Sequence, residues 1–413
     1  MSTVPRPPLL SLEEALARLL APVRPLADTE TLPCVAALGR VLAEDLISPL
    51  DVPPLANSSM DGYAVRRADI PEPGSVLPLS QRVAAGQVGQ PLAAGTAARI
   101  FTGAPLPPGA DAVVMQEQCT VLEGGGQVRF DVVPEPRQWV REQGEDVKRG
   151  AVVLPRGTRL TPQALGLAAT VGAARLSVVR RPRVALFSTG DELVMPGEPL
   201  RPGAIYNSNR YTLQGLLAQF GCDCTDLGIV PDSREATRSA LRRAAEGHDL
   251  ILTSGGVSVG EEDHLRPAVE AEGRLELWQV AIKPGKPLAF GQVNTAAGAS
   301  AWFVGLPGNP VASFMTFLLA VRPLLLALQG APTAAPTPVL LEAGFDWPRP
   351  DRRREFLRVR RAGEGRLELY TNQSSGVLSS TVWGDGVVDN PPGQPIRAGE
   401  RVRYLGFAEW LLT

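Results

Sequence analysis

The stretch that decides the fold class is Leu250-Ile251-Leu252-Thr253-Ser254-Gly255-Gly256, an apolar run that ends in two hydroxyl residues and two glycines. An apolar run of this length is typical of a buried β-strand. The glycines let the backbone after the strand approach an anion closely, and the start of a following helix adds its dipole to the same attraction. We therefore expect a strand–loop–helix unit that binds an anionic ligand at its loop.

Similar units lie on both sides of this stretch. Residues 184–187 form an apolar run that leads into Ser188-Thr189-Gly190-Asp191-Glu192, and residues 302–304 lead into Leu306-Pro307-Gly308-Asn309-Pro310. Helical patterns separate these runs, which predicts an α/β fold with a doubly wound parallel sheet and helices on both faces. Because the carboxyl ends of parallel strands meet at one edge, the three loops should share one crevice.

The rest of the chain has a different texture. Residues 11–20 predict a helix that opens with a capping box, and residues 34–46 predict a second helix. Val-rich runs between Gly and Pro clusters, from about 51 to 145, predict a β-rich segment with many turns. A further helix should begin after Thr161. Beyond a Pro/Ala/Thr linker at 331–338, short strands predict a small β barrel or sandwich.

Composition excludes several classes of function. The 413 residues include 41 Lys plus Arg and 43 Asp plus Glu, and the net charge of −2 offers no field for nucleic acid or an anionic membrane. Two histidines, and four cysteines without a C-x-x-C pair, exclude a three-His zinc site and argue against a disulfide framework. No uncharged apolar run reaches the ~18 residues that span a bilayer, and the N-terminus lacks a signal-peptide pattern. We therefore expect a cytoplasmic protein that binds neither nucleic acid nor membrane.

Charged residues gather at the expected edge of the sheet. Carboxylates follow two of the strands, at Asp191 and Glu192 and at 261–263, and hard oxygen ligands beside a phosphate-binding loop suit Mg²⁺. The turn Lys283-Pro284-Gly285-Lys286-Pro287 presents two point charges suited to an oxyanion. A solvated acidic loop and a hairpin with exposed lysines are the plainer alternatives, and the pattern alone leaves them open.

Several familiar catalytic motifs are absent. The chain has no Walker A sequence and no strand-linked G-x-G-x-x-G, which disfavours an ordinary P-loop NTPase or a nicotinamide enzyme. Gly256-Val257-Ser258-Val259-Gly260 matches the nucleophile-elbow pattern, but a hydrolase of that class needs an acid and then a histidine further along the chain. The last histidine is His264, directly after Asp263, so a Ser–His–Asp hydrolase is disfavoured.

Seven short motifs together carry a specific resemblance. They lie at 57–64, 101–105 with 111–117, 144–146, 188–193, 254–263, 282–287 and 306–310. In this order, and across essentially the whole chain, they resemble the motif series of the molybdopterin molybdenumtransferase family. That family includes the bacterial enzyme of molybdenum cofactor synthesis and the E domain of gephyrin. Taken singly, several of the motifs are only turns, so the ordered set carries the resemblance.

The resemblance implies four regions and an elongated homodimer. A linker or dimerisation region combines residues 1–50 with 145–180, and a β-rich domain covers 51–144. An α/β molybdopterin-binding domain covers 181–330, and a small C-terminal β barrel covers 331–413. The implied active site is a cleft between the α/β domain of one subunit and the β-rich domain of the other.

The reaction that the resemblance implies inserts molybdate into the dithiolene of adenylylated molybdopterin, with Mg²⁺-dependent release of AMP. The substrate's own sulfur atoms then hold the metal, which is in keeping with the scarcity of Cys and His. The implied metal ligands are Glu192 and Asp263. The implied catalytic residues are Asp61, Thr102, Asp146, Asp232 and Asp263. The implied substrate-binding residues are Ser254, Gly255, Gly256, Ser258, Lys283, Lys286, Pro307, Asn309, Pro310, Arg354 and Ser375.

Some choices stay open at the level of sequence. Arg352–Arg354 offers three registers for the C-terminal arginine, and several serines follow it at 374–380. A related molybdopterin adenylyltransferase shares the α/β domain but not the flanking domains, and a non-catalytic scaffold of the same fold is a third possibility. The sequence does not distinguish molybdate from tungstate, and it does not name other cofactor-synthesis proteins that deliver substrate or receive product.

Overall fold

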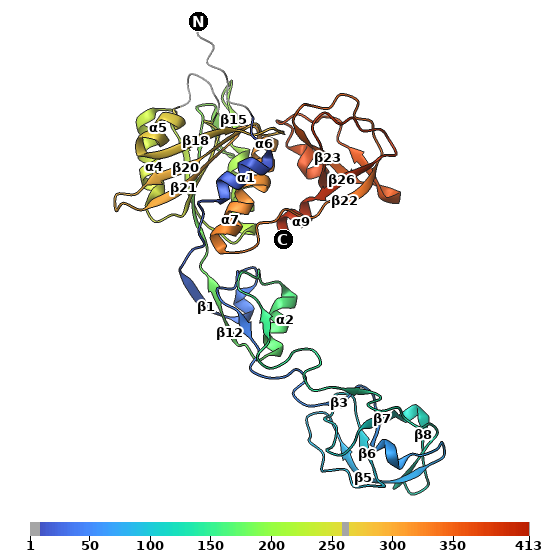
Figure 1. Cartoon of the computed structure of the whole chain (residues 1–413). Helices are drawn as coiled ribbons and strands as arrows, with labels where there is room; N and C mark the ends of the chain where they lie inside the picture. Colours follow the sequence, from blue (N-terminus) through green and yellow to red (C-terminus); the bar gives the residue numbers. More distant parts are fainter. Residues whose placement is uncertain (1–8, 258–263, 413) are drawn as a thin grey trace.

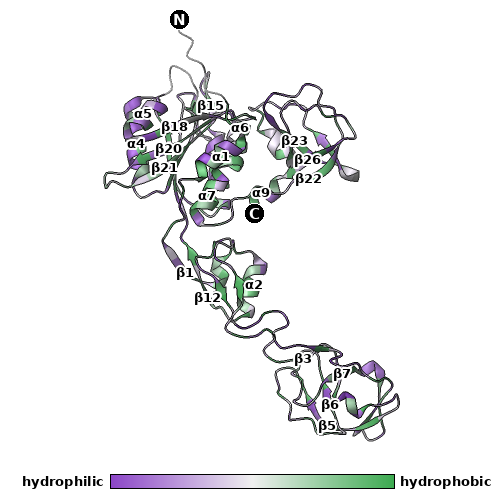
Figure 2. Cartoon of the chain, in the orientation of Figure 1, coloured by the Kyte–Doolittle hydropathy of each residue, from purple (hydrophilic) through white to green (hydrophobic). Residues whose placement is uncertain are grey.

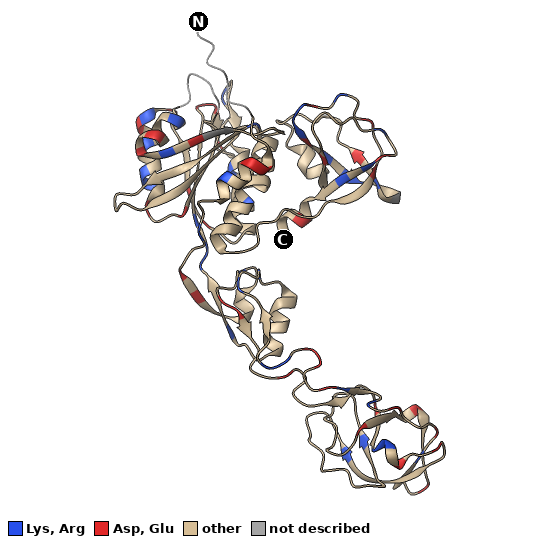
Figure 3. Ribbon diagram, viewed as in Figure 1, with Lys and Arg blue, Asp and Glu red and all other residues tan. Residues whose placement is uncertain are grey.

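Three bodies follow one another along an elongated molecule (Figure 1). The computed structural model describes residues 9–257 and 264–412. The α/β domain and the C-terminal barrel lie side by side at one end, a small middle unit follows, and the β-rich unit forms the other end. Basic and acidic residues are interspersed over all of these parts (Figure 3).

The α/β domain is built on a sheet of six strands in the order β16-β13-β17-β21-β20-β18. Its strands are β13 (Arg183–Thr189), β16 (Asp223–Val230), β17 (Leu250–Ser254), β18 (Gly273–Gln279), β20 (Pro287–Asn294) and β21 (Ser300–Leu306), with a small pair β14 (Leu193–Val194) and β15 (Ile205–Tyr206) beside it. The first four strands in the order run parallel, as predicted. β20 instead pairs antiparallel with β21, because the short connection at 295–299 permits only a hairpin, and β18 pairs antiparallel with β20.

Helices cover both faces of this sheet. They are α1 (Leu12–Leu20), α3 (Ser208–Gln219), α4 (Arg234–Ala245), α5 (Leu265–Glu272), α6 (Pro310–Thr316) and α7 (Arg322–Gln329), the last two joined by a π-helical turn η4 (Phe317–Val321). Alternate strand residues face opposite sides. Leu186 and Leu252 pack against α1, α3, α6 and α7, whereas Phe187 and Ile251 pack against α4 and α5. The outer surfaces of α4 and α5 are hydrophilic (Figure 2), so the predicted layered arrangement is confirmed.

The continuous helical run Pro310–Gln329 is long and apolar enough to cross a membrane by length and composition alone. However, 89% of its most apolar window is buried inside the protein. The run widens at η4 just before Pro323, which has no N–H to continue the α-helical ladder. Arg322, within the run, donates to the carbonyls of Trp410 and Ala334 at 3.0 and 3.2 Å. The run is therefore a core helix of the α/β domain.

The first helix, α1, has the predicted capping box. Ser11 Oγ accepts from the Glu14 N–H at 3.1 Å, and Glu14 Oε2 accepts from the Ser11 N–H at 2.8 Å. Its apolar stripe, Leu12 and Leu19, packs into the core of the α/β domain beside α7. The expectation that residues 1–50 lie together in the linker region is therefore wrong for α1, because its stripe finds its apolar partner on the core helix.

The middle unit joins the two larger bodies. It contains β1 (Thr29–Pro33) paired with β12 (Arg175–Val179), β2 (Leu46–Ile47) paired with β11 (Val152–Leu154), and helix α2 (Pro162–Thr170) with Thr161 as N-cap. The predicted helix over 34–46 is wrong. Only a single 3₁₀ turn, η1 (Cys34–Ala37), forms, because Leu38 is extended and Gly39 takes a left-handed φ of 74°.

The β-rich unit carries a sheet in the order β7-β4-β6-β5-β9-β8, which confirms the predicted β structure. Its elements are β3 (Asn57–Ser58), β4 (Gly62–Val65), β5 (Val76–Val83), β6 (Ala97–Ile100), β7 (Ala112–Met115), β8 (Cys119–Val121), β9 (Gln127–Phe130) and β10 (Val140–Arg141), with 3₁₀ turns η2 (Arg67–Asp69) and η3 (Gln116–Gln118). Tyr63 and Val65 face one core while Ala64 faces the other, so β4 is buried on both sides.

The C-terminal domain is a closed barrel, one of the two predicted alternatives. Its elements are β22 (Val339–Ala343), β23 (Arg354–Arg361), β24 (Arg366–Leu369), β25 (Gly386–Asn390) and β26 (Arg401–Gly406), with η5 (Gly363–Gly365), α8 (Ser379–Trp383) and α9 (Phe407–Leu412). The barrel closes because β25 pairs with both β26 and β23. A short strand of the α/β domain, β19 (Ile282–Lys283), pairs in parallel with β23 and sets Lys283 opposite Glu355. This pairing links the barrel to the crevice of the α/β sheet.

Candidate functional site

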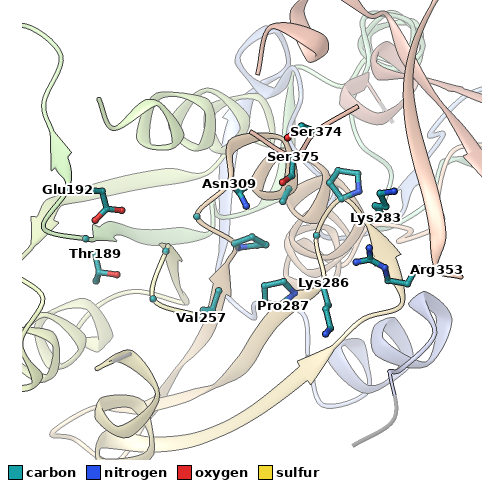
Figure 4. A pocket seen from close by; sticks show the side chains of 18 of the residues that line it. Thr189, Glu192, Val257, Lys283, Lys286, Pro287, Asn309, Arg353, Ser374 and Ser375 are labelled. Atoms are coloured by element: carbon teal, nitrogen blue, oxygen red, sulfur yellow. The ribbon is translucent and has the colours of Figure 1, made fainter. Parts of the chain in front are cut away.

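A cavity of about 670 Å³ opens at the carboxyl ends of β13, β17 and β21. Its walls come from the three predicted loops, from the turn after β19, and from two barrel segments (Figure 4). The predicted site residues that line it are Glu192, Asp232, Gly255, Gly256, Lys283, Lys286, Pro307, Asn309 and Ser375. Ser254 and Pro310 line an adjoining cavity of about 570 Å³ that shares Glu192, Gly255 and Asn309 with the first. The expected crevice therefore exists in the structure.

The glycine loop after β17 lies tightly against the end of β13. Gly255 and Gly256 have left-handed φ values of 91° and 67°. A Cβ on Gly255 would lie 2.8 Å from the Thr189 carbonyl oxygen, and one on Gly256 would lie 2.8 Å from Thr189 Oγ1. The Gly255 N–H donates to the Leu306 carbonyl at 3.1 Å. This amide is therefore committed to the sheet and is not available to a ligand.

One amide side chain ties the strand ends together beneath the cavity. Asn209 Nδ2, from α3, donates to Ser254 Oγ and to the Gly308 carbonyl, both at 2.7 Å. Asn209 and Ser254 are buried. Asn309 starts α6, but its side chain makes no capping hydrogen bond to the helix. Ser254 is therefore held by the protein, while the Asn309 amide faces the cavity.

The cations of the cavity meet carboxylates from the barrel. Lys283 Nζ lies 3.2 Å from Glu355 Oε1 and 3.5 Å from Asp351 Oδ2. Arg353 donates to both oxygens of Asp351, at 3.0 and 2.9 Å. These bonds from Arg353 hold the pKa of the Asp351 carboxyl well below its usual range. Among the described residues, no carboxylate pairs with Lys286, so this end of the cavity suits a small oxyanion.

Arg354, the residue of the 352–354 triplet that the resemblance implies, lies outside the cavity. Its guanidinium binds both oxygens of Asp389, at 2.5 and 2.7 Å, and Glu13 at 2.6 Å. The neighbouring Arg353 lines the cavity beside Lys283 (Figure 4). Successive residues at the start of a strand point to opposite sides, so a shift of one position exchanges the two arginines.

The acidic end of the cavity holds Glu192 and Asp232, both exposed. Asp263 and Ser258 lie outside the described residues. Over residues 9–257 and 264–412, no group of three His, Cys, Asp or Glu side chains forms a metal cage. Mg²⁺ keeps several waters and needs only one or two carboxylates together with substrate phosphates. The Glu192 carboxylate, which faces the cavity, fits that requirement (Figure 4).

The remaining predicted residues lie in or next to the β-rich unit, far from this cavity in the same chain (Figure 1). Asp61 Oδ1 accepts hydrogen bonds from the Thr102 N–H at 2.8 Å and from Thr102 Oγ1 at 2.9 Å. These bonds lower the pKa of the Asp61 carboxyl. Asp146 is exposed, and its N–H donates to the Val52 carbonyl at 3.0 Å. The structure thus brings Asp61 and Thr102 together but does not bring them to the cavity.

Four residues of the site escape a sequence-based analysis. Asn209 sits in an ordinary amphipathic helix, and Asp351 and Glu355 lie in a segment rich in charges. The roles of Asp351 and Glu355 depend on the pairing of β19 with β23, and nothing in the sequence near either strand indicates that pairing. For Arg353, the sequence indicates the triplet 352–354 as a candidate for the cavity. It does not indicate the residue at which the strand begins, which decides which arginine faces the cavity.

Three family models and several known proteins match this chain. The MoeA N-terminal region (domain I and II) matches residues 10–172, the probable molybdopterin binding domain matches 185–327, and the MoeA C-terminal region (domain IV) matches 341–407. Molybdopterin molybdenumtransferase of Haemophilus influenzae is 44% identical over 322 residues, 78% of each chain. The Nostoc sp. protein of the same name is 39% identical, over 73% of this chain and 70% of its own.

A solved structure agrees with these matches. The molybdopterin biosynthesis MoeA protein of Pyrococcus horikoshii OT3 superposes with a TM-score of 0.83 at 30% identity, covering 97% of this chain and 100% of that one. The similarity therefore extends over all the bodies described above and is not limited to the α/β domain. The chain belongs to the molybdopterin molybdenumtransferase family and is an enzyme of molybdenum cofactor biosynthesis.

Proposed function

We propose that this enzyme inserts molybdate into the dithiolene of adenylylated molybdopterin and releases AMP. The observation that carries the proposal is the cavity itself, which has a cationic end for an oxyanion, a glycine loop and an acidic end within one crevice. The substrate supplies the sulfur ligands of molybdenum, so the protein has only to bind, orient and stabilise charge.

At the cationic end, Lys283, Lys286 and Arg353 would receive molybdate. Lys283 and Arg353 are held by Glu355 and Asp351, so their positions are set before the oxyanion arrives. Ser375 lines the same end and offers a hydroxyl donor. The glycine loop and Asn309 lie between this end and the acidic end, where the substrate's phosphate groups would bind.

At the acidic end, Glu192 would hold Mg²⁺ together with Asp263. When bound, this ion neutralises negative charge that develops on the phosphate as the bond to AMP breaks. Asp232 lines the same end and would orient the phosphate or the water molecule that cleaves the phosphoanhydride, which leaves one phosphate on molybdopterin and releases AMP. Glu192 and Asp232 each follow a strand of the same sheet, β13 and β16, and both line this cavity.

We further propose a homodimer in which Asp61, Thr102 and Asp146 of one subunit face the cavity of the other. Two observations support this. The β-rich unit lies too far from its own cavity to complete it (Figure 1). The middle unit exposes apolar side chains, including Ile47 and Val152, which lie opposite each other in the β2–β11 pair, and Val35, which is 82% exposed.

We place the enzyme in the cytoplasm, in keeping with its free cysteines.

The test is AMP release by the purified enzyme. With adenylylated molybdopterin and Mg²⁺, AMP should appear when molybdate is added and not without it. Glu192→Gln should abolish the release, because the carboxylate is lost while the side-chain shape is kept. AMP release at the same rate with and without molybdate would contradict the proposal. Consumption of ATP with molybdopterin alone would instead identify an adenylyltransferase.

A further inference from the structure

The Asp61–Thr102 pair is held in a frame built around one arginine. Arg99, on β6, lies directly opposite Tyr63 on β4. Its guanidinium donates to the Gly62 carbonyl at 3.2 Å and to Gln116 Oε1 at 2.5 Å. It also lies over two aromatic rings, 5.1 Å from the centre of Tyr63 and 4.8 Å from that of Phe101. Arg99 therefore contacts three different segments at once.

Each of these segments also holds the pair. Gly62 follows Asp61 directly in the chain, and the Gln116 N–H donates to the Asp61 carbonyl at 3.0 Å. Phe101 precedes Thr102, whose N–H and hydroxyl both donate to Asp61 Oδ1. The guanidinium thus links the start of β4, the turn after β7 and the end of β6, and the Asp61–Thr102 bonds cross the space between the first and the last of these.

Arg99 does not itself bind the carboxylate. In the described part of the chain, Asp61 Oδ1 accepts only from Thr102, and no donor is bound to Oδ2. Oδ2 is consequently the atom left for a substrate or a proton. The charge of Arg99 adds to the hydrogen bonds of Thr102 in lowering the pKa of Asp61. A planar guanidinium can donate to two acceptors in its plane while its flat face stacks on a ring, whereas an ammonium has no flat face to stack.

We propose that Arg99 is a positioning residue that keeps Asp61 and Thr102 in the geometry in which they act in the partner subunit's cavity. The inference rests on the proposed function, since it assumes that Asp61 takes part in the reaction. It assigns a role in turnover to a residue outside the cavity. Misplacement of a reacting group by ~1 Å can lower the rate by ~100-fold, so loss of such a frame should be visible in kcat.

The chain offers a matched control in Arg82. Its guanidinium also lies over Phe101, 4.6 Å from the ring centre, but its side chain is exposed and, among the described residues, it bonds neither Gly62 nor Gln116. Replacing Arg82 removes one positive charge and one ring contact from the same surface. The frame around Asp61 stays intact in that variant.

The experiment compares Arg99→Gln, Arg99→Lys and Arg82→Gln in the AMP-release assay, with Asp61→Asn alongside. We expect Arg99→Gln to lower kcat by at least about 10-fold relative to Arg82→Gln, and to leave the molybdate KM within about twofold, because molybdate binds in another domain. Arg99→Lys should fall in between. Circular dichroism and thermal unfolding show which variants are folded. If Arg99→Gln does not fold, the comparison is made with Arg99→Lys.

The outcomes separate the two hypotheses. If Asp61→Asn is inactive while the folded Arg99 variant turns over as fast as Arg82→Gln, the positioning role is wrong and the proposed function stands. A molybdate KM that rises in parallel with the fall in kcat also contradicts the positioning role, since it indicates a general loss of structure. If Asp61→Asn keeps full activity, the role proposed for Asp61 is wrong and the inference falls with it.

Discussion

Arg353 and Arg354 are adjacent in the chain but have different roles. Arg353 lines the cavity and is paired with Asp351, which also approaches Lys283. Arg354 is paired with Asp389, whose side chain is 2% exposed, and with Glu13 on α1. The first arginine is therefore available to a ligand, and the second fastens the barrel to the N-terminal helix. The difference can be tested by removing each in turn.

We expect Arg353→Ala to raise the molybdate KM by about 10-fold or more, because a hydrogen bond to a charged group contributes ~1.5–3 kcal/mol. Arg354→Ala should leave that KM unchanged and lower the free energy of unfolding by ~1–3 kcal/mol, since Asp389 keeps Arg403 at 3.0 Å as a remaining partner. Initial rates against molybdate concentration, with urea unfolding, check both. Equal KM values for the two variants would place the oxyanion elsewhere.

The Asp61–Thr102 bonds predict a pH effect with a definite sign. Both bonds lower the pKa of the Asp61 carboxyl, the N–H contributing more than the hydroxyl. Thr102→Val removes the hydroxyl and keeps the N–H, so this pKa should rise part of the way towards its ordinary value of ~3.9. If ionised Asp61 is required, activity is lost at a higher pH on acidification. The acidic limb of the pH profile of kcat/KM should therefore shift to higher pH in Thr102→Val. It should not shift in Thr120→Val, a control variant on β8.

At this scale the sequence predicts residue types better than their partners. Glu192 is predictable because it follows a strand of the parallel sheet, and Lys283 and Lys286 because they lie on one proline- and glycine-rich turn. Asn209, Asp351 and Glu355 are not predictable, because each acts through a contact with a distant segment; Glu355, for example, lies 72 positions after Lys283. Arg99 is beyond a sequence-based prediction for the same reason, since its hydrogen-bond partners Gly62 and Gln116 lie in two other segments of the chain.

Among the elements, the loop after β17 leaves no room for a side chain next to the cavity. At Gly255, a left-handed φ coincides with a Cβ position 2.8 Å from a backbone oxygen of Thr189. Gly247, before the same strand, has a left-handed φ of 76° with no atom within 4 Å of its Cβ position. The two glycines therefore share the conformational demand, and only Gly255 is closely packed against a cavity wall.

We expect Gly247→Ala to cost ~1–2 kcal/mol of stability, the penalty of a left-handed alanine, with normal AMP release. Gly255→Ala should carry the same penalty and also push Thr189 and the loop apart, which should lower kcat/KM at least about 10-fold. Thermal unfolding and the AMP assay measure the two effects separately. Normal turnover by a folded Gly255→Ala enzyme would show that this loop is not part of the binding site.

Elements were predictable where a local signal sets their first residue. Ser11 and Glu14 start α1, and Thr161 followed by Pro162 starts α2, as expected. The segment 34–46 has a helical composition. A helix does not form there because Gly39 has a left-handed φ and because residues 41 and 42 pair with segments distant in the chain. The position of α1 in the α/β core was also beyond local signals, since an apolar stripe does not say which surface it will cover.

The whole molecule separates two halves of one proposed site. The cavity lies in the α/β domain, next to the barrel. The Asp61–Thr102 pair lies in the β-rich unit, at the opposite end of the molecule (Figure 1). A monomer with this shape could not bring them together without a large rearrangement. A two-fold dimer could, because each β-rich unit would then reach the other subunit's cavity, and both sites would form at once.

Subunit mixing tests this arrangement directly. Asp61→Asn damages the β-rich half of a site and Glu192→Gln damages the cavity half, so each homodimer should be inactive. In a mixed dimer, one site combines the intact cavity of one subunit with the intact β-rich unit of the other. After unfolding and joint refolding in equal amounts, random pairing should restore about a quarter of the wild-type activity. Mixing Glu192→Gln with Lys283→Ala, both cavity variants, should restore none, because every site then contains a damaged cavity. If the first mixture also stays inactive although mixed dimers are isolated through different affinity tags on the two variants, each site is built within one chain and the proposed dimer is wrong.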